Sequence, residues 1–224
     1  MTDPQRAHPN PLLQRQRWSS LNGPWRFLFD DAQTLHHPLE IDAWERTIQV
    51  PFPPESEASG IGDRGFHPCC WYERDVELLP DDGRAILRFG AVDYSAKVWV
   101  NNHLAATHEG GHTPFSADIT SLLDPSGRQK VTVLVVDDPH DLTKPRGKQD
   151  WQKEPHAIWY PRTTGIWQTV WIERVARTYV DKIRWTPHVE SYALRFEARV
   201  AGDAIEDLSI EVLLRHGKRV LARD

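Results

Sequence analysis

Helical periodicity is the feature that this sequence most clearly lacks. No apolar stripe at helical spacing continues over three turns, and 17 Pro and 13 Gly divide the 224 residues into short segments. Short segments bounded by turn residues are typical of all-β proteins. The best short helix covers residues 119–123, where Asp118 is placed to cap the N-terminus and Pro125 to end the helix. The sequence therefore predicts an all-β fold.

Several segments have the side-chain pattern of β-strands. Residues 71–79 and 169–175 alternate apolar and polar side chains, as strands with one buried face do. Residues 131–136 are apolar on both faces, so we expect them in the middle of a sheet that is covered on both sides. Turn residues separate these segments at roughly the spacing found in β-sandwiches. A two-layer sandwich is the expected architecture.

The pattern divides the chain into three parts. Residues 1–17 are rich in Pro, Arg, Gln and Asn and are expected to form a flexible N-terminal segment. Residues 18–177 hold the sandwich. Residues 178–224 contain about four strand-like segments, whereas an immunoglobulin-like sandwich needs about seven strands and about 100 residues. Because the sequence ends within strand-like residues, we expect residues 178–224 to be an incomplete immunoglobulin-like domain.

Charge and composition exclude several classes of protein. The net charge is −5 and Lys and Arg are scattered, whereas nucleic-acid binding needs a basic face. No segment approaches the roughly 18 apolar residues of a membrane span, and residues 1–16 lack the apolar stretch of a signal peptide. Cys69 and Cys70 are adjacent, so a disulfide between them would be strained. We expect a cytoplasmic protein without nucleic-acid or membrane partners.

Five motifs occur along the chain in a fixed order, within residues 21–187. They are residues 21–27 (LNGPWRF), 50–52 with 70–74 (VPF, CWYER), 89–94 with 98–102 (FGAVDY, VWVNN), 108–115 with 118–120 (HEGGHTPF, DIT) and 162–171 (RTTGIWQTVW). Together they resemble the N-terminal sugar-binding domain of glycoside hydrolase family 2. The local chemistry agrees, because Asn101 and Asn102 tolerate the positive φ of a tight hairpin and Gly110 and Gly111 allow a backbone path closed to other residues.

The resemblance implies a jelly-roll-like β-sandwich (galactose-binding-domain-like), then an immunoglobulin-like domain, then a (β/α)₈ barrel. It also implies a retaining β-glycosidase, in which two Glu of the barrel, about 5–5.5 Å apart, cleave the O-glycosidic bond. In the family the acid/base Glu follows an Asn, and none of the four Asn here precedes a Glu. We therefore expect a β-galactosidase-like parent enzyme whose catalytic barrel is missing from these residues, which are inactive alone.

No metal or catalytic pair is expected within this chain. None of the eleven His has the paired spacing with a third ligand that zinc sites show. The family resemblance implies Mg²⁺ or Na⁺ in some full-length enzymes, with ligands mostly outside this region. Two pairs of carboxylates could in principle act as acid and base. Adjacent Asp137 and Asp138 would point to opposite faces of an extended strand. In the pair of Glu109 and Asp118, Asp118 already has a capping role. Catalysis by the chain alone is not expected.

In the family, loops of the first domain form one side of the sugar pocket. Two loops of this chain match them. The first, residues 53–68, is long for a strand connection and contains the candidate substrate-binding residues Glu55, Asp63, Arg64 and His67. The second, residues 144–162, mixes aromatic and polar groups that suit a sugar and contains the candidates Trp151, His156, Trp159, Tyr160 and Arg162. The alternative is that these loops pack on a partner domain.

The sugar itself is not identified by these residues. Several β-galactosidases and β-glucuronidases of the family carry a sugar-contacting Asp six residues before the glycine that matches Gly165, and Trp159 stands there in this chain. The leading hypothesis is a carbohydrate-binding and scaffold domain whose partners are a β-glycoside and the missing barrel. A free-standing carbohydrate-binding module and an assembly domain of a homo-oligomeric glycosidase are the alternatives.

Overall fold

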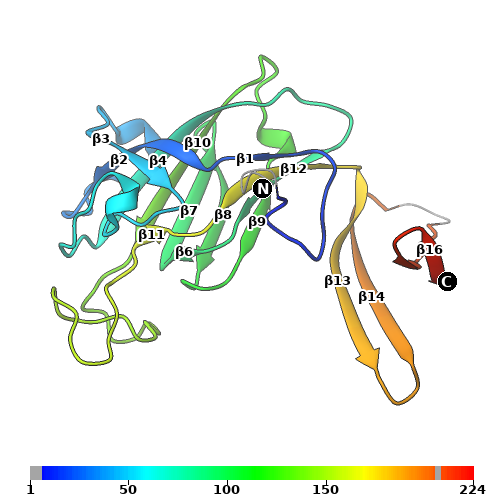
Figure 1. The fold of residues 1–224 in the computed structure, drawn as a ribbon. Coiled ribbons are helices and arrows are strands. Elements are labelled where there is room, and N and C mark those ends of the chain that lie inside the picture. Colours follow the sequence, from blue (N-terminus) through cyan, green and yellow to red (C-terminus); the bar gives the residue numbers. More distant parts are fainter. Residues whose placement is uncertain (1–6, 205–207) are drawn as a thin grey trace. The chain divides into compact units, whose positions relative to one another are not determined.

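The computed structural model describes residues 7–204 and 208–224, and its regular structure consists of β-strands and short 3₁₀ turns (Figure 1). The all-β prediction is confirmed. The helix expected at residues 119–123 is a single 3₁₀ turn, η4 (Thr120–Leu122). Asp118 Oδ1 accepts a hydrogen bond of 3.0 Å from Thr120 N at its start. Within the described residues, no helix has the length and hydropathy needed to span a membrane.

Two antiparallel sheets form the framework of residues 1–176 (Figure 1). The four-stranded sheet has the order β1 (Trp18–Ser20), β12 (Val170–Val175), β5 (Arg84–Phe89), β9 (Phe115–Asp118). The six-stranded sheet has the order β3 (Arg46–Val50), β2 (Gly23–Phe29), β4 (Cys69–Glu77), β10 (Arg128–Val136), β7 (Ser95–Val100), β8 (His103–Glu109). A short ladder joins β11 (Gly165–Ile166) to β6 (Val92–Asp93). Strands far apart in sequence pair side by side, as expected for a jelly-roll-like sandwich.

The main core is built from alternate residues of strands in both sheets. On β10, Val131, Val133 and Val135 belong to this core. Phe27 of β2 and Tyr72 of β4 meet edge to face, with ring centroids 5.0 Å apart. Both rings are fully buried. Because side chains on a strand alternate between faces, every second residue of these strands is buried here.

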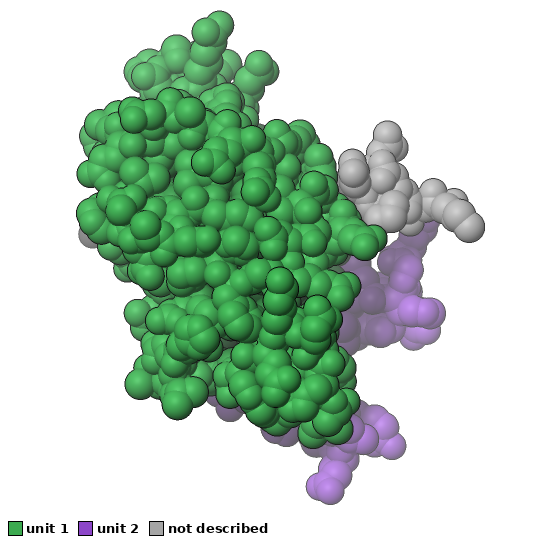
Figure 2. Space-filling model, turned by 90° about the vertical axis from the view of Figure 1, so that its left-hand side faces the viewer, with its two compact units in different colours: residues 1–176 green, residues 177–224 purple. Residues whose placement is uncertain are grey.

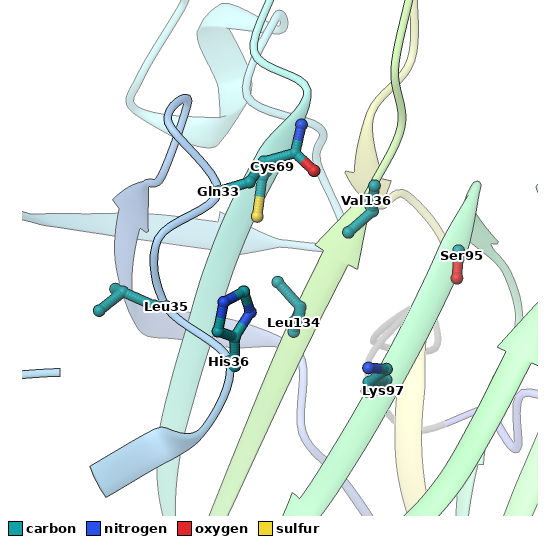
Figure 3. A pocket seen from close by; sticks show the side chains of 8 residues that line it. All are labelled: Gln33, Leu35, His36, Cys69, Ser95, Lys97, Leu134 and Val136. Carbon is teal, nitrogen blue, oxygen red and sulfur yellow. The ribbon is translucent and has the colours of Figure 1, made fainter. Parts of the chain in front are cut away.

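The other face of β10 is also covered at one end of the sheet. Leu134 joins Trp71 and Trp99 in a second apolar cluster, against which side chains of the loop before β3 pack. A cavity of about 160 Å³ remains beside this cluster (Figure 3). It is lined by Gln33, Leu35, His36, Cys69, Ser95, Lys97, Leu134 and Val136. The prediction that residues 131–136 are covered on both faces is therefore confirmed.

The turn between β7 and β8 has the backbone that its sequence predicts. Asn101 and Asn102 have φ of 51° and 66°, in the left-handed region that asparagine tolerates better than most residues. The Asn101 side chain also donates to Leu122 O at 2.8 Å and to Gln129 Oε1 at 2.7 Å. The residue therefore shapes the hairpin and ties it to the neighbouring turn.

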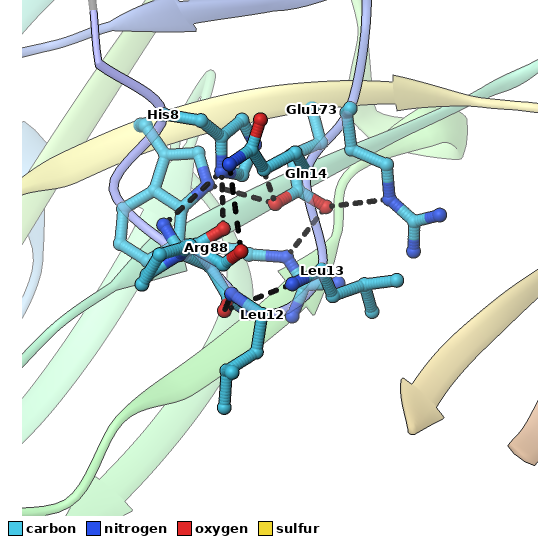
Figure 4. Close-up of polar contacts among 10 residues, drawn as sticks. His8, Leu12, Leu13, Gln14, Arg88 and Glu173 are labelled. Carbon is cyan, nitrogen blue, oxygen red and sulfur yellow. Dashed lines mark hydrogen bonds and ion pairs between the residues drawn. The ribbon is translucent and has the colours of Figure 1, made fainter. Parts of the chain in front are cut away.

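The segment before β1 contacts the four-stranded sheet at Glu173 of β12 (Figure 4). Arg15 Nε lies 3.3 Å and His8 Nε2 lies 3.6 Å from the Glu173 carboxylate. Arg88 Nε of β5 lies 2.8 Å from the same group, which is only 1% exposed. The sequence predicts a flexible segment over residues 1–17, whereas residues 8–15 make these contacts and residues 1–6 lie outside the described residues.

The chain divides into two compact units, residues 1–176 and 177–224 (Figure 2). The second unit contains two antiparallel hairpins. The longer pairs β13 (Thr178–His188) with β14 (Ala193–Gly202), and the shorter pairs β15 (Leu213–His216) with β16 (Arg219–Arg223). The incomplete immunoglobulin-like domain expected at residues 178–224 stays a prediction.

The longer hairpin has one apolar and one charged face. The pairing register shifts between Val180 and Lys182. Because of this shift, Val180 lies on the same face as Ile183, Trp185 and Pro187. The Trp185 and Phe196 rings lie 4.5 Å apart, yet Trp185 is still 39% exposed. Such a face is normally buried against a second sheet. Its members are Val180, Ile183, Trp185, Pro187, Leu194, Phe196, Ala198 and Val200.

Deleting residues 179–224 is expected to reduce aggregation while the first unit stays folded. The deletion removes the exposed apolar face and its open strand edges, whereas the main core lies within residues 1–176. Size-exclusion chromatography should show less aggregate, and the melting midpoint of the first unit should change by less than about 4 °C. Deleting only residues 208–224 is the control, because it keeps the apolar face and should leave aggregation in place. Loss of folding on the longer deletion would place the boundary elsewhere.

Candidate functional site

The two candidate loops meet at one end of the first unit. Residues 51–68 connect β3 to β4 and contain the first candidate loop, residues 53–68. Residues 137–164 connect β10 to β11 and contain the second candidate loop, residues 144–162. The first residue of β4 pairs with the last residue of β10. The first loop therefore ends, and the second begins, at the same end of these two neighbouring strands. Thr164 N donates a hydrogen bond of 3.2 Å to Glu55 Oε2, which joins one loop to the other. The fold therefore brings together the two segments selected from the sequence.

Arg162 lies inside this loop contact. Its Nη2 is 2.6 Å from Asp137 Oδ2 and 3.3 Å from Asp137 O. Its guanidinium also lies over the Phe66 ring, 5.6 Å from the centroid. Thr164 Oγ1 donates to the same Asp137 oxygen at 3.3 Å. Since both charged side chains are largely buried, Arg162 ties the loops together in this structure.

Three buried carboxylates gather around Arg162, and we call Glu55, Asp93 and Asp137 the carboxylate junction. Burial raises the pKa of Glu55 to about 7, although hydrogen bonds from Thr164 and the charge of Arg162 oppose this. Burial and the nearby charge of Asp137 raise the pKa of Asp93 to about 6. Burial also raises the pKa of Asp137, against the effect of Arg162. One guanidinium does not offset the desolvation of three carboxylates.

Gln149 and Gly111 enclose Asp93. Gln149 Nε2 donates to Asp93 Oδ2 at 2.7 Å, and its Oε1 accepts from Thr163 N at 2.7 Å. A Cβ atom on Gly111 would overlap the Asp93 carboxylate. The double glycine of the fourth motif is thus explained at Gly111 by this close approach. Gln149 in turn fixes the second loop to the sandwich.

The space inside the loop contact is small. A cavity of about 20 Å³ is lined by residues that include Asp93, Asp137, Lys144 and Arg162. That volume holds about one water molecule and no sugar ring. Any sugar at this end of the sandwich would therefore contact the exposed side chains of the two loops.

The remaining candidates of the first loop differ in their exposure. A backbone hydrogen bond within its own turn, assisted by His67, lowers the pKa of Asp63. The His67 ring stacks on Phe29 with centroids 3.6 Å apart, and its Nδ1 lies 3.0 Å from Asp31. Arg64 is exposed. Of these side chains, Arg64 is the one that faces solvent most openly.

Asp150 organises the second loop. It has no exposed surface and accepts hydrogen bonds from Gln152 N at 2.9 Å, His156 N at 2.7 Å and His156 Nδ1 at 2.7 Å. Desolvation opposes its charge, but these hydrogen bonds outweigh desolvation and lower the pKa of Asp150. An Asp whose side chain accepts from the N–H two residues ahead is a known turn feature.

The aromatic side chains of the second loop pack mainly on one another. Trp151 lies 5.1 Å from Trp159 and 5.1 Å from His156 between ring centroids. The Arg146 guanidinium lies 5.1 Å from the centroid of Trp151. Tyr160 differs, because 63% of it is exposed, against 41% for Trp151. The two Trp rings therefore support the loop, and Tyr160 offers the most exposed ring to a ligand.

Sequence reasoning found the loops and two residues that join them, Glu55 and Arg162, but it missed their partners in the contact. Asp93 was visible as part of a motif, and Asp137 was considered only as half of an adjacent acid pair. Thr164, which bridges the loops, has no distinctive sequence signal. Over residues 7–204 and 208–224, no group of three or more His, Cys, Asp or Glu side chains is arranged to hold a metal ion.

Known proteins resemble this chain in the same region. Residues 60–143 match the family model described as "Glycosyl hydrolases family 2, sugar binding domain". The β-glucuronidase of Canis lupus familiaris is 29% identical over 237 residues, which cover 92% of this chain and 36% of that protein. The β-glucuronidase of Homo sapiens is 29% identical over 232 residues, which cover 89% and 35%. The chain thus spans about a third of the length of these curated relatives.

Solved structures share the fold. The β-glucuronidase of Faecalibacterium prausnitzii superimposes with a TM-score of 0.69 at 24% identity, covering 95% of this chain and 40% of that one. The β-glucuronidase of Ruminococcus gnavus gives 0.72 at 19% identity, covering 97% and 38%. The matched residues 60–143 run from the first loop through β10 and end one residue before the second loop. Residues 60–143 are therefore similar to the sugar-binding domain of the glycosyl hydrolases of family 2, and the fold of the chain is similar to the corresponding part of β-glucuronidases.

Proposed function

We propose that this chain is the carbohydrate-binding and scaffold part of a retaining β-glycosidase whose catalytic carboxylates lie outside these 224 residues. The observation that carries the proposal is the joining of two loops at one end of a sandwich whose residues 60–143 match the family 2 sugar-binding domain. Retention needs two carboxyl groups about 5–5.5 Å apart that reach the glycosidic bond. The carboxylates of the junction are instead buried, and they accept hydrogen bonds from Thr164 at Glu55, from Gln149 at Asp93 and from Arg162 at Asp137.

For the sugar, which the sequence leaves open for a β-galactosidase-like parent enzyme, the proposal favours a β-glucuronide. The relatives described above are named β-glucuronidases. Residues 144–162 contain five Lys or Arg against two acidic residues, in a chain of net charge −5. Arg146 lies over Trp151, and stacking leaves the in-plane N–H donors of a guanidinium free for a carboxylate. A carboxylated sugar suits such a loop.

The alternatives differ from this proposal in measurable ways. If a catalytic barrel supplies the other wall of the pocket, the chain alone should bind sugar with a dissociation constant in the millimolar range or weaker, about −4 kcal/mol. A free-standing carbohydrate-binding module would bind more tightly without help. An assembly domain would self-associate, which light scattering at increasing protein concentration detects.

Sugar contact is tested by replacing Tyr160 with alanine. Methyl β-D-glucuronide is expected to shift the indole N–H resonances of the Trp residues in the second loop. Tyr160→Ala should weaken that binding about fivefold, because a stacked aromatic ring contributes about 1 kcal/mol. Tyr192→Ala is the matched control, since Tyr192 is 97% exposed in the second unit. Equal binding by the two variants would exclude Tyr160 from the site.

The purified chain should not hydrolyse 4-nitrophenyl β-D-glucuronide or the matching galactoside. Turnover that is abolished by one carboxylate substitution, such as Asp93→Asn, would overturn the proposal that the catalytic carboxylates lie outside these residues. Turnover that is unaffected by every such substitution would point to a contaminating enzyme.

A further inference from the structure

The carboxylate junction is the part of the structure that the proposed function leaves unused. Thr164 bridges two of its members, because its N–H donates to Glu55 at 3.2 Å and its Oγ1 donates to Asp137 at 3.3 Å. Asp93 lines the same small cavity as Asp137. The three carboxylates come from the first loop, the short strand β6 and the start of the segment after β10. The junction is thus where the two candidate loops are joined.

The charges around the junction are unbalanced. Arg162 pairs with Asp137 at 2.6 Å, and Lys144 lies at the same cavity. Other titratable groups face the junction: the charge of Glu55 raises the pKa of Cys70 and Tyr72 of β4, His112 lowers the pKa of Asp93, and Lys144 lowers and Asp138 raises that of Asp137. Three ionised carboxylates would therefore be buried around one buried guanidinium. Burial of like charges favours the protonated acid.

We propose that the carboxylate junction is a proton-controlled latch, which holds the two loops together when Glu55 is protonated and loosens them when all three carboxylates ionise. The inference rests on the proposed function, because the loops that it controls are those assigned to the sugar. When Glu55 is protonated, its carboxyl group can still accept the hydrogen bond from Thr164 N–H, and one of the buried charges is removed. When Glu55 ionises, it still accepts this hydrogen bond, but its negative charge is buried without a second guanidinium to pair with it.

The direction of the effect follows from linkage. The pKa of Glu55 is about 7 in the folded protein, above its ordinary 4.5, so the closed junction binds the proton more tightly than the open one. The closed state is therefore favoured fully below about pH 4.5, and that advantage is lost as the pH rises through about 7. Asp63 and Asp150 have pKa values lowered from 3.8, so they act only at more acidic pH.

Hydrogen exchange at Thr164 N–H tests the latch in the full chain. From pH 5 to pH 8, its protection factor, corrected for the intrinsic exchange rate, is expected to fall about 100-fold, since each unit of pKa shift is worth tenfold. Glu55→Gln keeps an acceptor oxygen and loses the titration, so its protection should stay nearly constant. Glu57→Gln changes an exposed residue of the same loop and should retain the wild-type slope.

Each result decides between the two claims. Constant protection in the wild type, or an unchanged slope in Glu55→Gln, would overturn the latch; should that variant not fold, a reduced slope in Asp93→Asn supports the latch and an unchanged one overturns it. Methyl β-D-glucuronide is titrated at both pH values, and binding is expected to be weaker at pH 8. A pH-dependent Thr164 N–H without any sugar-induced shift would support the latch and refute the sugar role of the loops.

Discussion

Replacing Arg162 with methionine is expected to lower the free energy of unfolding of the first unit by about 3–5 kcal/mol. The guanidinium lies 2.6 Å from Asp137 Oδ2, and both side chains are largely buried. Methionine keeps much of the volume but leaves the Asp137 carboxylate buried without its partner. Urea unfolding followed by Trp fluorescence measures the effect.

Two further variants separate this effect from a loss of surface charge. Arg64→Met removes the same charge from an exposed residue of the facing loop and should cost less than about 0.5 kcal/mol. Adding Asp137→Asn to Arg162→Met should recover part of the loss, because the Asp137 charge is then no longer buried without its partner. If Arg162→Met and Arg64→Met unfold at the same urea concentration, Arg162 does not stabilise the loop contact.

Replacing Gly165 with alanine is expected to cost about 3 kcal/mol. Gly165 has φ of +80°, and a Cβ atom there would overlap the hydroxyl group of Tyr72. Tyr72 is fully buried in the main core, so it has little room to move away. Left-handed backbone costs an alanine about 1 kcal/mol, and overpacking a core adds about 1–3 kcal/mol. Thermal and urea unfolding at pH 6 both report the change.

Gly147→Ala is the matched control for the backbone term. Gly147 has φ of +60° with open space around the added methyl group, so its replacement should cost only about 1 kcal/mol. The difference between the two variants then isolates the clash with Tyr72. Equal losses of stability would mean that the Tyr72 side chain moves aside without cost.

The strands were predictable because their side-chain pattern records which face is buried. Residues 131–136, apolar on both faces, lie in β10 between two apolar clusters. The order of strands was not predictable in the same way. β1 pairs with β12 through Trp18 and Glu173, and no local pattern indicates a partner so distant in the chain.

The candidate site was predictable as a location but not residue by residue. Loop length and composition pointed to the segments that carry Glu55 and Arg162, and the fold brings both together. Their burial depends on Asp137 and Thr164, which come from other positions in the chain. Whether a polar side chain binds a ligand or is enclosed by its neighbours depends on such tertiary contacts, which composition does not encode.

The contacts of Glu173 bear on how this domain should be cut for expression and crystallisation. A shortened protein that starts at Trp18, the first strand residue, would lose His8 and Arg15 from the buried carboxylate and leave Arg88 to face it. The fresh N-terminus would also uncover Trp171, whose ring lies 6.5 Å from His8. The useful starting point lies before residue 8, and a purification tag belongs on a spacer ahead of it.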